Sequence, residues 1–557
     1  MRMRLLFLLA VGWMAFSCQT RPTTDVCRVE DGVLLSPEGE PLSLWGVNFQ
    51  TPLSWEASRL ARAGVPVTSE GLNAVTDRNL DDVIRMEADF LRCHLTPADF
   101  TDGEGNLVDS PYLDALDYLV SEAGKRGLSL CFAFLNHMRK DGPGALWAGK
   151  GDKTWLLDSA VIACTRNYIS QLLVHPNKYD GTLYRDARQI AYWELVNEPL
   201  MYSREEMQDT PYFPAYQNWL RDRGLEDGED SFSRFREETV RSYIGETTAV
   251  IRAAGDRHPV CWGLNWHRFR RQNADIFRGA ATSEAELVAF CNYPGQDSVA
   301  QDYSHLRYDF TDRGFSEWFG KYASLADGYA WTLEKDFSDK AVVVYEFETF
   351  FNQSAWMYPC QALYFKSLRA QAATMWTYTF AEIAEKFGGS HYLNLRTTPG
   401  KAASFIVARH LFESRKPGTP VTIEDEMKGD GWAISRSHNA AVYSDAEWYC
   451  HSGETASGWS GVEPAPTVRH IRGLGSSSLV EYAGTGLYFI DVLSDSLRIE
   501  IMPDVRIVGD VFSKPDFQTV VTELDEEAVH PFKIRLPAWK DTLSLSLKPG
   551  KYTIALP

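Results

Sequence analysis

Strand-like and helix-like stretches alternate along the first three quarters of the chain. Apolar runs typical of buried parallel strands occur eight times, at residues 45–49, 90–95, 128–135, 191–199, 259–264, 287–294, 341–348 and 373–378. Apolar residues recur at helical spacing over 81–89, 112–126, 159–174, 235–254, 320–337, 362–372 and 400–412. Eight repeats of strand and helix predict an α/β fold, a (β/α)8 TIM barrel. A short hairpin within 29–49 leads into the first strand.

The pattern changes after residue 413. A linker-like Pro-Gly-Thr-Pro stretch at 417–420 is followed, up to residue 556, by short runs of alternating apolar and polar residues. This periodicity predicts a C-terminal all-β, sandwich-like domain. We therefore expect four segments: a signal peptide, a tether, the barrel and the β-sandwich, at 1–17, 18–27, 28–413 and 418–557.

The first residues have the layout of an export signal. Arg2 and Arg4 precede an apolar run at 5–11 that is too short to span a membrane. The residues around Cys18 resemble the cleavage box of bacterial lipoproteins, which predicts a lipidated Cys18 and an anchor in a bacterial cell envelope. The alternative is an ordinary secretion signal with an incidental cysteine, because Phe16 is bulky for such a box.

Composition limits the partners. The formal net charge of −19 repels nucleic acids and anionic surfaces, so we expect no nucleic-acid partner and membrane contact only through the lipid anchor. Eight cysteines besides Cys18 are scattered without metal-ligand spacing. Cys93, Cys131 and Cys261 are expected to be buried thiols, with one or two disulfides left open among the others. No phosphate loop or dinucleotide motif occurs, so we expect no cofactor.

Two glutamates follow or end predicted barrel strands. The strand at 191–199 closes with Asn197-Glu198-Pro199, and the strand at 341–348 carries Glu346. Proline ends a strand, and the C-terminal strand ends of a barrel carry its chemistry. Two carboxylates on two strand ends are what a two-carboxylate glycosidase needs. Glu348 is a rival to Glu346, because residues two apart in a strand face the same side.

These positions resemble a known family. Seven residues match, in order and on the expected elements, the clan A retaining glycosidases, above all glycoside hydrolase family 5, the cellulase and β-mannanase family: Arg92, His137, Asn197, Glu198, Tyr293, Glu346 and Trp376. The resemblance covers the barrel, and residues 180–186 followed by 192–199 are similar to the β-mannanase version. Two positions depart from the family: Cys291 stands where a histidine is common, and Glu348 where glycine is common.

The resemblance implies catalytic roles for the two glutamates. Glu198 would be the acid/base and Glu346 the nucleophile, with the two carboxyl groups roughly 5 Å apart. Arg92 and Tyr293 would hold Glu346 ionised, and Asn197 would contact a sugar 2-hydroxyl. Trp376 would form the floor of the sugar subsite, and His137 is either a sugar contact or a core histidine. Glu194, on the same face as Glu198, is expected to be structural and paired with a basic residue.

The implied substrate is an oligo- or polysaccharide. The favoured substrate is β-mannan or a related β-1,4-hexosan, and β-glucan is the second choice. The sequence does not distinguish endo from exo action or hydrolysis from transglycosylation, and it does not give the oligomeric state. The alternative function is binding without catalysis: a glycan-binding lipoprotein built on a degenerate barrel. Several tryptophans are either sugar platforms or packing residues: Trp55, Trp147, Trp155 and Trp266 in the barrel. In the C-terminal domain, Trp459 would bind carbohydrate if that domain does more than stabilise the barrel.

Overall fold

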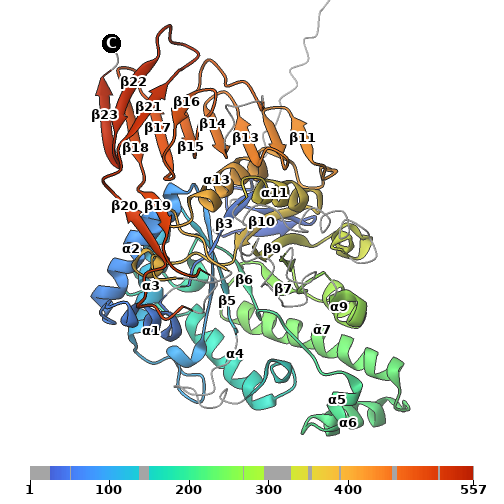
Figure 1. Ribbon diagram of the computed structural model, residues 1–557. Helices are drawn as coiled ribbons and strands as arrows, with labels where there is room; N and C mark the ends of the chain where they lie inside the picture. Colours follow the sequence, from blue (N-terminus) through green and yellow to red (C-terminus); the bar gives the residue numbers. More distant parts are fainter. Residues whose placement is uncertain are drawn as a thin grey trace, which may run out of the picture.

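The computed structural model describes residues 26–50, 52–136, 150–267, 269–293, 328–348, 354–387, 391–453, 459, 461–511 and 515–555. Eight parallel strands form a closed barrel in chain order (Figure 1): β3 (Leu44–Asn48), β4 (Phe90–His94), β5 (Ser129–Ala133), β6 (Ile190–Glu194), β7 (Val260–Gly263), β8 (Leu287–Asn292), β9 (Ala341–Phe347) and β10 (Ala370–Met375). The predicted TIM barrel is confirmed.

Helices cover the outside of the barrel. They include α2 (Ser69–Arg85), α3 (Pro111–Lys125), α4 (Ser159–Leu173), α7 (Glu229–Ala253), α9 (Ala274–Ala281), α11 (Met357–Ser367) and α13 (Pro399–Ser414). Side chains that accept backbone N–H bonds fix three of their starts, at Thr68, Ser110 and Asp158. The other described α-helices are α1 (Ser54–Arg62), α5 (Arg204–Gln208), α6 (Phe213–Arg223), α8 (Phe269–Gln272) and α12 (Ala381–Ala384).

Three predicted helices were wrong in extent or type. The helix predicted at 81–89 is only the end of α2, which Thr68 starts thirteen residues earlier. The helix predicted at 362–372 is shifted, because α11 ends at Ser367 and β10 already begins at Ala370. In the described part of 320–337, two 3-10 turns, η5 (Ala330–Leu333) and η6 (Lys335–Phe337), replace the predicted α-helix.

A hairpin closes the N-terminal end of the barrel. Strands β1 (Arg28–Glu30) and β2 (Val33–Leu35) pair antiparallel about a turn at 31–32, and the turn that the sequence predicts at 36–40 follows, closed by a bridge between Leu35 and Pro41. Leu34 is buried with Leu44, Phe90 and Leu287, which lie near the starts of β3, β4 and β8. The opposite, C-terminal end therefore remains for chemistry.

The C-terminal region is rich in β-strands. Its eight-stranded sheet contains β11 (Glu426–Gly429), β12 (Trp432–Ser435), β13 (Ala440–Ser444), β14 (Trp448–Ser452), β15 (His470–Gly473), β17 (Tyr488–Val492), β18 (Ser496–Ile501) and β23 (Gly550–Ala555). A three-stranded sheet, β16 (Val480–Tyr482), β21 (His530–Ile534) and β22 (Leu543–Leu547), shares a hydrophobic core with it, which gives the predicted sandwich-like arrangement. Trp459 is partly buried against this core.

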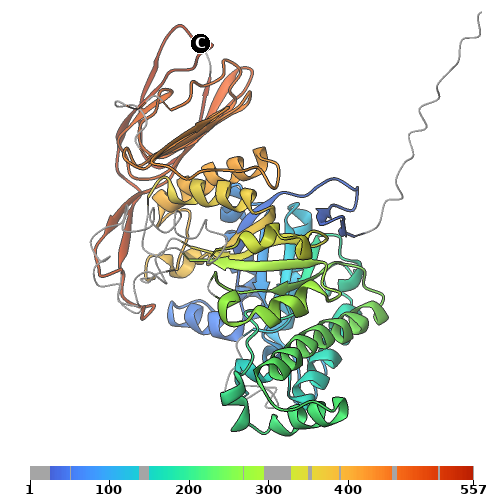
Figure 2. The same cartoon turned by 90° about the vertical axis from the view of Figure 1, so that its right-hand side faces the viewer.

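The barrel and the C-terminal sheet pack through α13. Figures 1 and 2 show α11 and α13 between the barrel and the eight-stranded sheet, and α13 contacts both β3 and β14. Glu87 of the barrel accepts from Arg472 of the sheet (2.9 Å) and contacts His410 of α13 (2.9 Å). This buried polar junction joins the two regions.

A two-stranded arm extends from the C-terminal region back to the barrel. It consists of β19 (Asp504–Ile507), β20 (Thr522–Asp525) and the chain between them, and Figure 1 shows it beside α2. The N–H of Val521 donates to the carbonyl of Glu385 (2.8 Å), and the ring of Phe517 lies 5.9 Å from that of Phe387. Both barrel partners lie in the segment that follows β10.

All eight cysteines in the described residues are buried thiols, and none of the eight forms a disulfide. The three expected buried thiols, Cys93, Cys131 and Cys261, are therefore confirmed.

Among the helices that the structure describes, none combines the length and apolar character needed to cross a bilayer. Cys18 and the segment 1–25 lie outside the described residues.

Candidate active site

Six of the seven side chains singled out from the sequence lie on or directly after barrel strands at their C-terminal ends. Arg92 is on β4 and Glu346 is on β9, while Asn197 and Glu198 follow β6, Tyr293 follows β8 and Trp376 follows β10. The seventh, His137, lies outside the described residues. Residues separated by more than 250 positions in sequence thus converge on one end of the barrel.

Arg92 is the centre of the site. Its guanidinium is fully buried and makes five side-chain contacts: Glu194 (2.6 and 2.8 Å), Asn48 (2.8 Å), Asn197 (2.9 Å), His94 Nε2 (2.9 Å) and Glu346 (3.1 Å). The two bonds to Glu194 form the two-pronged pair that arginine and carboxylate favour. Glu194 thus pairs with a basic residue, as expected, but that residue belongs to the site itself.

Glu346 is held as a carboxylate. The Tyr293 hydroxyl donates to its Oε2 (2.6 Å), Arg92 donates to its Oε1, and His94 Nε2 lies 3.5 Å from Oε1. Burial alone would raise the pKa of Glu346, but the contact with His94, the charge of Arg92 and the bond from Tyr293 outweigh it, and the pKa is lowered. An ionised, oriented carboxylate is what a nucleophile requires.

Glu198 has a strained backbone. Its φ of 49° lies in the left-handed region, which costs a non-glycine residue about 1–3 kcal/mol and is typical of functional positions. The Tyr345 hydroxyl donates to its Oε1 (3.3 Å), and the Cys291 thiol lies 3.9 Å from the same oxygen. Unlike Glu346, which is buried, Glu198 is half-buried.

A β-bulge explains why Tyr345 and Glu346 both contribute to the site. Along β8, Phe290 pairs with Val344 and Cys291 with Glu346, so Tyr345 is the extra residue. Val343 and Tyr345 face the barrel interior, and without the bulge Glu346 would face the helices. The extra residue reverses the alternation and turns Glu346 inward.

Glu348 faces the other way. It lies in the layer between barrel and helices, where Lys401 of α13 contacts both carboxylate oxygens (3.0 and 3.1 Å) and the Tyr358 hydroxyl of α11 donates to Oε1 (2.9 Å). The positive charge of Lys401 balances the negative charge of the Glu348 carboxylate, which lies away from the barrel opening. This geometry favours Glu346 over its rival.

Aromatic rings border the site. The ring of Trp376 lies 4.9 Å from that of His94, and the ring of His391 lies 5.2 Å from that of Tyr293. Burial lowers the pKa of His391 to about 3, so this imidazole is neutral. The peptide bond from Trp376 to Thr377 is cis.

Sequence reasoning missed His94 and Tyr345. His94 has a detectable signal, because it follows Arg92 by two positions in a strand and must face the same side. The sequence contains no such signal for Tyr345, because strict alternation along a strand would place Tyr345 and Glu346 on opposite faces of the sheet.

The tryptophans proposed as sugar platforms have different surroundings. Trp155 is fully buried and is a packing residue. Trp55 is half-buried with the guanidinium of Arg59 4.5 Å from its ring, and Trp266 is 36% exposed. Trp147 lies outside the described residues.

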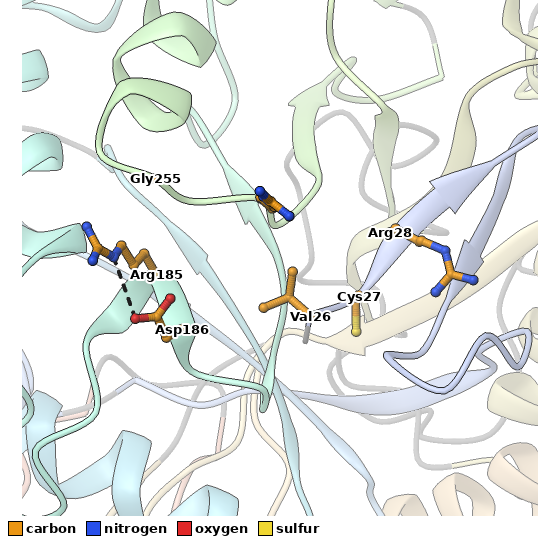
Figure 3. Close-up of a pocket in the computed structure, with 7 residues that line it drawn as sticks. Val26, Cys27, Arg28, Arg185, Asp186 and Gly255 are labelled. Carbon is orange, nitrogen blue, oxygen red and sulfur yellow. Dashed lines mark ion pairs between the residues drawn. The ribbon is translucent and has the colours of Figure 1, made fainter. Parts of the chain in front are cut away.

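A cavity of about 570 Å³ lies at the other end of the barrel. Arg185 and Asp186 precede β6, Gly255 and Arg257 precede β7, and Cys27 and Arg28 complete the lining (Figure 3). The cavity is therefore at the N-terminal strand ends, remote from the glutamates, and takes no part in the chemistry of the glutamate pair.

The chain is similar to plant enzymes over part of its length, while no protein-family model matches it. It is 24% identical over 223 residues to a mannan endo-1,4-beta-mannosidase 2 of Arabidopsis thaliana, covering 38% of this chain and 44% of that one. It is 27% identical over 217 residues to a mannan endo-1,4-beta-mannosidase 5 of Solanum lycopersicum, covering 35% and 49%. The chain thus spans less than half the length of these relatives.

One solved structure aligns with most of the chain. The endo-1,4-beta-mannanase from Rhizomucor miehei matches 70% of this chain and 100% of its own, at 13% identity and a TM-score of 0.48.

Proposed function

We propose that this chain is a retaining glycoside hydrolase that cleaves β-linked glycans by double displacement. The observation that carries the proposal is the pair of glutamates at the barrel opening, one clamped as a carboxylate by Arg92 and Tyr293, the other half-buried beside Tyr345. A retaining glycosidase needs two such carboxyl groups in different surroundings, one as nucleophile and one as acid/base.

The reaction has two steps. In the first, Glu346 attacks the anomeric carbon and forms a glycosyl ester, while Glu198 gives its proton to the leaving oxygen. In the second, Glu198 takes a proton from water, which attacks the anomeric carbon and releases Glu346. Asn197, which is oriented by Arg92 (2.9 Å) and Asn136 (3.0 Å), would hydrogen-bond the sugar 2-hydroxyl, and Trp376 would stack against the sugar ring.

β-Mannan is the first substrate to test. The partial similarity to mannan endo-1,4-beta-mannosidases supports this choice, and β-glucan is second. The chain from Gln19 to Pro557 would be incubated with a panel of β-glycans, beside Glu346→Ala and Glu198→Gln.

Release of sugar from one polymer by the parent chain, lost in Glu346→Ala, is the expected result. NMR of the first-formed anomer should show retention, and an inverted product would overturn the double displacement. Binding to a polymer without turnover by the parent chain would instead support the non-catalytic glycan-binding alternative.

The same proposal includes the location and domain roles. Lipidation at Cys18 would anchor the chain to a bacterial cell envelope, residues 28–413 would form the catalytic unit, and residues 418–557 would stabilise it. Labelled palmitate should be incorporated into the full chain and not into Cys18→Ala. A parent chain that is secreted without label would contradict the anchor.

A further inference from the structure

Tyr345 is positioned under the glutamate pair by the β-bulge. Its carbonyl accepts from Asn48 of β3 (3.0 Å) and from the Thr374 hydroxyl of β10 (2.6 Å), and these two bonds fix the extra residue of β9. Its side chain is fully buried, and the guanidinium of Arg92 lies 4.9 Å from its ring centre. A ring clamped at its backbone and its face can hold its hydroxyl in one place.

We infer that Tyr345 is a positioning residue for Glu198: its hydroxyl donates to Oε1, favours the ionised form of that carboxyl group, and directs the transferable proton to the other oxygen. This inference rests on the proposed function. A hydrogen bond to a carboxylate stabilises the charged form, and a protonated carboxyl group carries its proton preferentially on the oxygen that is not accepting this bond.

Tyr345 is a permanent donor in this pair. Burial, together with the charges of Cys291, Glu198 and Glu346, raises the pKa of Tyr345 well above its ordinary value. The phenol therefore keeps its proton at neutral and moderately basic pH. It acts by donating a hydrogen bond and takes no part in the proton transfer itself.

Several other groups influence the titration of Glu198. Among the described residues these include Cys291 of β8, Tyr293 directly after β8 and Glu346 of β9, with Arg92 of β4 bound to Asn197. His137 lies outside the described residues. The negative charge of Glu346 opposes ionisation of Glu198, whereas the hydrogen bond from Tyr345 favours it. The two effects on the pKa of Glu198 are therefore opposite in direction.

The test is Tyr345→Phe in the chain from Gln19 to Pro557. Tyr358→Phe is the matched control, because it also removes a buried tyrosine–glutamate hydrogen bond (2.9 Å to Glu348), but on the helix side of the barrel. In a chain labelled with ¹³C at glutamate carboxyl carbons, Glu198→Gln identifies the resonance of Glu198.

Loss of one hydrogen bond should raise the titration midpoint of Glu198 by about 0.5–1 pH unit in Tyr345→Phe and leave it unchanged in Tyr358→Phe. The basic limb of kcat/KM against pH should move upward by the same amount. Hydrolysis of a dinitrophenyl glycoside, whose leaving group needs no proton, should keep its kcat/KM within about twofold, because its first step does not use Glu198 as an acid.

An unchanged midpoint in Tyr345→Phe would overturn the inference. So would an equal loss of kcat/KM on activated and unactivated substrates, which indicates a structural role. Because the NMR titration needs no turnover, it tests the Tyr345–Glu198 pair even if the parent chain hydrolyses no glycan. Should Tyr345→Phe fail to fold, 3-fluorotyrosine placed at 345, a stronger donor of similar size, should lower the midpoint, and no change would count against the pair.

Discussion

The buried pair of Lys401 and Glu348 provides a direct test of which glutamate of β9 is structural. Both side chains are at most 1% exposed, and the lysine also donates to the carbonyl of Tyr392 (3.2 Å). Lys401→Met would leave the Glu348 carboxylate buried without its cation. Removing one partner of such a pair costs about 3–5 kcal/mol, which for a unit of this size is a fall in Tm of about 5 °C.

The double variant Lys401→Met with Glu348→Gln should recover most of this loss. The introduced amide can still accept the hydrogen bond from Tyr358 through its oxygen. Exchange of a buried ion pair for neutral groups often changes the free energy of unfolding little, so we expect a Tm within about 1–2 °C of the parent chain. Calorimetry on the four members of the cycle measures the coupling.

Two results would refute this reasoning. A loss below about 1 kcal/mol in Lys401→Met would mean that the pair is not buried as described. Complete loss of hydrolysis in a folded double variant would mean that Glu348, and not Glu346, is the nucleophile.

Three further predictions concern stability. Burial lowers the pKa of Lys366 from 10.5 to about 7, so the unfolded chain binds this proton more tightly, and the folding stability that depends on this group rises between pH 7 and 10.5. Lys366→Met should therefore raise Tm more at pH 6 than at pH 9. An equal gain at the two pH values would contradict the lowered pKa. Phe517→Ala should cost about 3 kcal/mol and lower Tm, whereas Val529→Ala, at a position 60% exposed, should not. A chain ending after Ser414 should aggregate on gel filtration, because it loses the sheet that covers α13; a monodisperse, folded barrel would show that the sheet is dispensable.

The barrel could be predicted from sequence because its strands are buried on both faces. A strand such as β9, with Ala341 to Tyr345 all apolar or aromatic, differs visibly from the amphipathic helices around it. The helix start at Ser69 was missed because its signal is a cap at Thr68 rather than a hydrophobic run. The start of β10 was misplaced because its alanines at 370–373 suit helix and strand alike.

The candidate site was only partly predictable. Strand ends and spacing pointed to Glu198 and Glu346, since both follow from the position of a residue in its strand. The inward rotation of Glu346 depends on a bulge, and a bulge is set by the pairing of three strands rather than by the local sequence. Glu348 differs from Glu346 because β9 ends at Phe347, so the strand alternation that made the two glutamates equivalent does not extend to Glu348.

The charges of the buried carboxylates and of Arg92 influence when Glu198 can ionise in the two proposed steps. Arg92 is the cation shared by Glu194 and Glu346, and burial followed by the charge of Glu346 raises the pKa of Glu194 against the opposing effect of Arg92. A third negative charge at Glu198 is therefore opposed until Glu346 becomes an uncharged ester, which in the proposed reaction would make Glu198 an acid in the first step and a base in the second. Glu194→Gln removes one negative charge, so the basic limb of kcat/KM should move to lower pH, opposite to Tyr345→Phe. Shifts in the same direction for both variants would show that charge balance does not govern Glu198.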